Sequence, residues 1–96
     1  MKNSLMRVLW IGLCLALLLA AQPAQLVIVN HNPAAVTVQV WRYTGNHWDW
    51  ITLAAVPPGR SIALSQVNRN DRFRALGPWS TPPIHVVSSP RDVWQL

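Results

Sequence analysis

Glutamate is absent from this chain of 96 residues, and lysine and cysteine each occur only once, as Lys2 and Cys14. A single cysteine excludes an intramolecular disulfide and any zinc site built from several thiolates. Without glutamate, the only carboxylate side chains for acid–base chemistry are three aspartates: Asp49, Asp71 and Asp92. We therefore expect one small domain of modest stability that depends on burial of tryptophan and aliphatic side chains.

Long hydrophobic runs are also missing, with one exception near the N-terminus. Residues 8–21 are apolar, follow the cations Lys2 and Arg7, and are fewer than the roughly 20 residues that cross a bilayer as a helix. A positive start, a short apolar stretch and small residues at its end are typical of a secretory signal peptide. The sequence thus predicts a signal-peptide helix over residues 1–21, cleavage before Gln22, and a secreted or periplasmic protein.

Two alternatives concern this N-terminal segment. Leu19 occupies a position before the cleavage site where a small residue is preferred, so cleavage after Ala24 is the other candidate. If no cleavage occurs, the segment would tether the protein to a membrane, which is the only membrane contact we expect. Cys14 does not predict a lipoprotein, because Leu13 precedes it and apolar residues continue after it.

Basic residues outnumber acidic ones after this segment, with six arginines and three aspartates in residues 22–96. The only basic cluster comprises Arg69, Arg72 and Arg74, which is sparse beside the basic patch of a nucleic-acid-binding protein. We therefore expect no nucleic-acid partner and interpret the cluster as a solvated edge. Recognition of an acidic polymer or a lipid headgroup by these arginines is the alternative.

The rest of the chain alternates between short apolar–polar segments and turn residues, which is typical of β-strands. Asparagine, proline and glycine interrupt the pattern at 31–33, 57–59 and 68–70. The expected strands are residues 26–30, 36–43, 48–53, 61–67, 71–76, 84–88 and 93–96. We predict an all-β fold, a small antiparallel β-sandwich of about seven short strands, as a single domain over residues 22–96.

A four-residue loop at 44–47 would make a hairpin of the second and third expected strands. In that register Arg42 faces Asp49, which carries the opposite charge. A shift of one residue would separate these charges and mix the two faces of the hairpin. One face then carries two aliphatic pairs that we expect to be core: Val40 with Ile51, and Val38 with Leu53.

The opposite face of the hairpin carries aromatic rings with two hydrogen-bonding side chains beside them: Trp41, Tyr43, Trp48, Trp50, Gln39 and Thr52. Indole rings offer flat apolar area with one donor, so these six are the candidate ligand-binding residues. Sugars and proline-rich peptides both suit such a surface. The alternative is a second packing face, covered by Trp79, Trp94 or the proline-rich segment 77–83.

Catalytic and metal-binding patterns are weak in this sequence. The three histidines, His31, His47 and His85, are scattered without the spacing of metal ligands, so we expect no metal site. The serines lie in no nucleophile motif, and no glycine-rich loop is present to hold a phosphate. We predict that the protein is not an enzyme and has no catalytic residues and no cofactor.

Four short motifs punctuate the expected strands: Val29-Asn30-His31-Asn32-Pro33, Val40-Trp41 with Tyr43 and Gly45, Thr52-Leu53, and Pro57-Pro58-Gly59. Together they resemble the β domain of the von Hippel-Lindau tumour suppressor family and its bacterial look-alikes. The resemblance implies a β-sandwich that recognises a peptide, which bears hydroxyproline in the eukaryotic case. It places Trp41 and Trp50 at pocket positions. Ser65, Gln66 and Asn70 replace other pocket residues, so hydroxyproline binding is not implied.

These patterns favour an exported, non-enzymatic binding module that recognises an extended peptide or glycan on the aromatic face. The alternative is a structural or assembly protein of the cell envelope, in which the aromatic face or an open sheet edge buries against another chain. An assembly protein would be an oligomer, whereas a binding module would be a monomer with accessible tryptophans.

Overall fold

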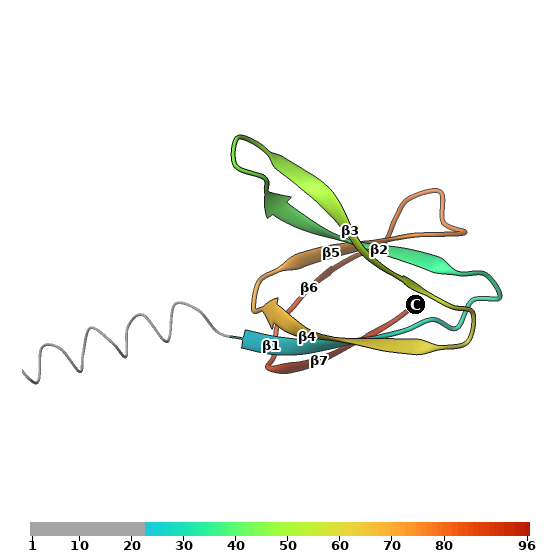
Figure 1. The fold of residues 1–96 in the computed structure, drawn as a ribbon. Coiled ribbons are helices and arrows are strands. Elements are labelled where there is room, and N and C mark those ends of the chain that lie inside the picture. Colours follow the sequence, from blue (N-terminus) through green and yellow to red (C-terminus); the bar gives the residue numbers. More distant parts are fainter. Residues whose placement is uncertain (1–22) are drawn as a thin grey trace, which may run out of the picture.

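The computed structural model describes residues 23–96, and the predicted signal-peptide helix and its cleavage before Gln22 lie outside them. All regular structure in this range is β, which confirms the predicted all-β class, and no helix there is long and apolar enough to span a membrane. The seven strands form a three-stranded sheet, β4-β1-β7, and a four-stranded sheet, β3-β2-β5-β6 (Figure 1). Their bounds are β1 Pro23–Val29, β2 Val36–Tyr43, β3 Trp48–Val56, β4 Ser61–Asn68, β5 Arg72–Leu76, β6 Ile84–Val86 and β7 Arg91–Gln95.

The prediction of an antiparallel sandwich is wrong at one strand pair. β7 lies parallel to β1, with Trp94 beside Ile28, while the other four pairs of neighbouring strands are antiparallel. Parallel neighbours cannot be joined by a tight hairpin and need a long connection. Here that connection is the whole stretch of chain from β2 to β6, which is long enough to bring β7 alongside β1 in the same direction.

The core lies between the two sheets and follows from alternation along the strands. In β2 every second side chain, at Val36, Val38 and Val40, is fully buried, and Leu26 and Ile28 of β1 are fully buried opposite them. Successive side chains of a strand point to opposite faces of its sheet, so each strand contributes one buried row. The remaining buried apolar side chains include Val56, Val67, Phe73, Ala75, Val87 and Trp94.

One polar side chain, Asn30, is fully buried among residues 23–96. Its Nδ2 donates to the carbonyl oxygens of Ala34 and Val56 at 2.9 and 3.1 Å, and its Oδ1 accepts from the backbone amide of Asn32 at 2.9 Å. A buried amide without partners would cost stability, so these bonds are what allow it to be buried. Asn30 thereby ties the β1–β2 connection to the end of β3.

The predicted register of the β2–β3 hairpin is confirmed from its loop back to the pair of Gln39 and Thr52. It is wrong one step further, where Val38 pairs with Ala54. A β-bulge leaves Leu53 without an opposite residue, and such an insertion bends and twists its strand.

The hairpin also corrects part of the predicted core. Val38 and Val40 are fully buried as expected, but Ile51 and Leu53 are 36% and 38% exposed. β3 is an edge strand, and the distal part of the hairpin projects beyond the three-stranded sheet (Figure 1). The inner face of β3 therefore stays open to solvent at these two positions.

Candidate functional site

The outer face of the β2–β3 hairpin brings together the four predicted aromatic residues, which we call the aromatic strip: Trp41, Tyr43, Trp48 and Trp50. Because Val38 and Val40 point into the core, alternation turns Trp41 and Tyr43 outward. The indoles of Trp41 and Trp48 are nearly parallel, at 16°, with centroids 6.2 Å apart. Trp41 also lies 5.2 Å from Trp50, and Tyr43 lies 5.8 Å from Trp48, so the four rings form one connected row.

Solvent reaches this strip. Tyr43 and Trp48 are each 57% exposed, and Trp41 and Trp50 are half-buried. The two tryptophans that could have covered the strip lie elsewhere: Trp94 is in the core, stacked on His85, and Trp79 packs against the core. Neither of these tryptophans therefore covers the strip.

A polar network borders the strip on the same face of the sheet. The Arg74 Nε donates to Gln39 Oε1 at 2.7 Å, and Gln39 Nε2 donates to Thr52 Oγ1 at 3.0 Å. The Arg74 guanidinium lies 4.5 Å above the ring of Trp50, in position for a cation–π interaction. Gln39 and Thr52 thus lie beside the rings as predicted, but they bond to one another, and Gln39 supports an arginine that orients Trp50.

Sequence reasoning missed Arg74 at this site because its position depends on a long-range strand pair. Gln39 and Arg74 are opposite one another in the β2–β5 ladder, so their side chains share the outer face. The sequence itself showed Arg74 only as part of a basic cluster after β4. The signal that could have found it is the alternation of Phe73 and Ala75, which are buried, with Arg72 and Arg74, which are not.

A hollow of about 260 Å³ lies at the distal end of the strip, lined by Trp41, Trp48, Asn70, Asp71 and Arg72. Asn70 and Asp71 come from the β4–β5 turn and Arg72 is the first residue of β5; in the turn, Asn70 adopts a left-handed backbone with φ of 72°. Asparagine tolerates that conformation better than most residues. Asp71 Oδ2 accepts the backbone amide of Asn68 at 2.9 Å, which fixes the carboxylate beside the hollow. The hollow therefore combines two flat rings with an amide, a carboxylate and a guanidinium.

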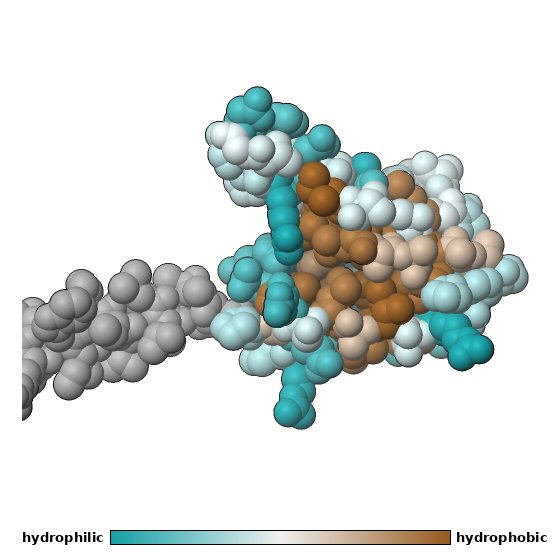
Figure 2. Space-filling model, viewed as in Figure 1, coloured by the Kyte–Doolittle hydropathy of each residue, from teal (hydrophilic) through white to brown (hydrophobic). Residues whose placement is uncertain are grey.

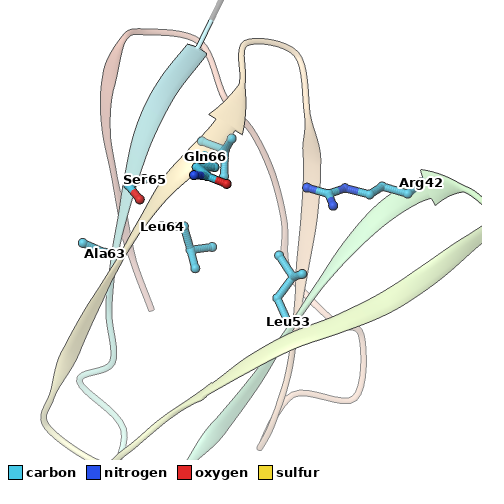
Figure 3. A pocket seen from close by; sticks show the side chains of 7 residues that line it. Arg42, Leu53, Ala63, Leu64, Ser65 and Gln66 are labelled. Atoms are coloured by element: carbon cyan, nitrogen blue, oxygen red, sulfur yellow. The ribbon is translucent and has the colours of Figure 1, made fainter.

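The residues singled out by the resemblance do not meet at one place. Asn70 lies beside Trp41 in the hollow, whereas Ser65 and Gln66 line a separate groove between the two sheets (Figure 3). Successive side chains of a strand point to opposite faces of the sheet. Trp41 lies on the outer face of the hairpin, whereas the groove lies on its inner face. The structure thus brings together the aromatic residues and Asn70 but not the others.

Two histidine–aspartate contacts are present in the described part of the chain. His47 Nε2 of the hairpin loop lies 3.8 Å from Asp49 Oδ2 of β3, where both side chains are exposed, and His85 Nε2 lies 2.9 Å from Asp92 Oδ2, where both are largely buried. Burial alone raises the pKa of Asp92, but the Ser88 amide and His85 outweigh it, so this pKa lies below its ordinary value. Among residues 23–96, no three histidine or carboxylate side chains gather as metal ligands would.

Comparison of the chain with family models, with curated proteins and with solved structures finds no match. Evidence for the function therefore comes from the geometry of the strip and the hollow.

Proposed function

We propose that this protein is an exported, non-enzymatic binding module that holds an extended ligand on the aromatic strip. The observation that carries the proposal is a connected row of four rings of which two, Tyr43 and Trp48, are more than half exposed. Leaving large aromatic surfaces in water is unfavourable, and exposed apolar patches commonly mark binding sites. Rigid aromatic side chains also supply contact area at a small cost in conformational entropy.

The polar groups around the hollow favour a glycan over a proline-rich peptide. A proline-rich segment offers mainly carbonyl acceptors, because proline has no N–H, so the Asp71 carboxylate would find no donor there. Sugar hydroxyls donate and accept, which suits a site where Asp71 can only accept and Arg72 can only donate. The hollow of about 260 Å³ is smaller than the ~300–1,000 Å³ pockets of drug-sized ligands, so it fits one ring of a longer chain.

Electrophoresis through gels that contain soluble polysaccharides of different linkage tests this proposal. At least one polysaccharide should retard the protein, and Trp48→Ala should abolish the retardation without lowering the melting temperature. Val93→Ala is the matched control, because Val93 is a similarly exposed apolar residue on the other sheet. Retardation that Trp48→Ala leaves intact, or binding of proline-rich peptides alone, would contradict a glycan site on the strip.

A structural or assembly role is supported by a different observation. Ile84 and Val86 of the edge strand β6 are 58% and 44% exposed. They lie on the same outer face of the four-stranded sheet as the aromatic strip, at the edge opposite β3. An apolar edge of this kind can bury against a second chain. Sedimentation at micromolar concentration separates the two functions: a stable oligomer that Ile84→Asp dissociates would favour assembly, and a monomer favours the binding module.

A further inference from the structure

A second surface, on the inner side of the same hairpin, lies open between the two sheets. β3 and β4 follow one another in the chain and are edge strands of different sheets, and no ladder joins them. Between them is a groove of about 360 Å³. Figure 2 shows apolar side chains gathered between the sheets on this side, with hydrophilic residues around them. The groove is lined by Arg42, Leu53, Ala63, Leu64, Ser65, Gln66 and Val67.

Both edge strands are irregular where they border this groove. In β3 the bulge leaves Leu53 unpaired, and in β4 an irregularity places Ser65 and Gln66 opposite Gln25 alone. Bulges redirect side chains and interrupt the row of backbone groups that an added strand would need. The groove is therefore poorly suited to a β-strand partner and better suited to a ligand that contacts side chains.

The lining side chains define the chemistry of that ligand. Leu53 and Leu64 point toward each other across the groove, and Arg42 reaches in from the end of β2 (Figure 3). Arg42 stands opposite Asp49 in the ladder, yet the Asp49 carboxylate bonds to the Trp50 amide. No hydrogen bond or ion pair within residues 23–96 involves the Arg42 guanidinium, and no acidic side chain lines the groove. Two facing leucine side chains are thus combined with one uncompensated cation.

We propose that this groove binds a single aliphatic chain that ends in a carboxylate. The chain would lie on Leu53 and Leu64, and Arg42 would hold the carboxylate through paired N–H···O bonds. Gln66, which also lines the groove, offers a further donor. A volume of about 360 Å³ is at the lower end of ligand pockets, which suits one short chain and not a two-chain lipid. The site is independent of the aromatic strip, because it lies on the opposite face of the hairpin.

The proposal can be tested by titrating the purified protein, as cells produce it, with hexanoate, octanoate and decanoate. Each is kept below its critical micelle concentration. Affinity should rise about fourfold for each added methylene until the groove is filled. The methyl resonances of Leu53 and Leu64 should shift on binding. Arg42→Gln should weaken octanoate binding about tenfold or more, since a hydrogen bond to a charged group is lost. Arg60→Gln, which removes an exposed arginine of the β3–β4 turn, is the matched control and should change nothing.

Three patterns of binding would overturn this assignment. These are affinities that do not depend on chain length, equal binding of octylamine, whose head is cationic, and shifts confined to the tryptophan resonances. Absence of binding at millimolar octanoate would overturn it as well. Trp48→Ala should leave the octanoate affinity unchanged, so that failure of the groove and failure of the aromatic strip remain distinguishable.

Discussion

Side chains alternate between the two faces in both the covered and the uncovered parts of the four-stranded sheet, but the inward side chains are buried to different extents. Where the three-stranded sheet lies opposite, the inward side chains Val38, Val40 and Phe73 are fully buried. On the edge strand β3, the inward side chains Ile51 and Leu53 stay more than a third exposed, and at the projecting end of the hairpin the outward rings of Trp48 and Tyr43 are exposed as well. Alternation therefore selects a face, but only a second layer makes that face a core.

The largest contrast is expected between two aromatic residues, one in each part. Phe73→Ala should lower the free energy of unfolding by about 3–5 kcal/mol, because it opens a cavity at a fully buried site. Trp48→Ala should cost about 1 kcal/mol or less, since it removes only cross-strand ring contacts from an exposed position. Urea denaturation of both variants measures the difference. Similar losses in the two would mean that the hairpin is covered after all.

A smaller contrast is expected between two neighbours in one ladder. Val40 and Ile51 are paired, but only Val40 is fully buried. Val40→Ala should cost about 2 kcal/mol, from lost burial of its methyl groups and a small cavity. Ile51→Ala should cost about 1 kcal/mol or less, although more atoms are removed. The reverse order in chemical denaturation would place the boundary of the core further along the hairpin.

The Asp92 carboxylate, which contacts His85, adds a test through pH. The pKa of Asp92 is lower in the folded protein than its ordinary value of 3.8, so its ionised form stabilises the fold above that pH. This contribution is lost as the pH falls below 3.8 through the folded pKa. Asp92→Asn should therefore flatten the acid side of a stability-against-pH curve. A curve that Asp92→Asn leaves as steep as before would contradict this assignment.

The smallest effect is expected from the charged pair that helped to set the register. Arg42 faces Asp49 as predicted, but no ion pair forms between them. Arg42→Ala should therefore change the free energy of unfolding by at most about 0.5 kcal/mol. A thermal melt with and without salt checks this, because a loss that disappears at high salt would reveal an ion pair.

Much of the candidate site could be predicted because it lies within one hairpin. The loop at 44–47, the alternation of β2 and the opposition of Trp41 and Trp50 are local features, set by turn chemistry and by the two-residue period of a strand. Asn70, Asp71 and Arg74 could not be assigned to the site in the same way. They approach the strip only through the β2–β5 pairing, which joins residues more than thirty positions apart along the chain.

The sequence by itself determined the all-β class, the order and approximate positions of the strands, and the division of the hairpin into an aliphatic and an aromatic face; the ends of β1 and β3 differ from those expected. These follow from turn residues and from alternation, which act over a few neighbouring positions. Only the tertiary structure decided which parts of those faces are covered, that β7 lies parallel to β1, and that Leu53 stands in an open groove. Whether a side chain is covered depends on where the second sheet lies, and the bulge at Leu53 depends on how β2 and β3 pair along their whole length. Neither is encoded in the period of any single strand.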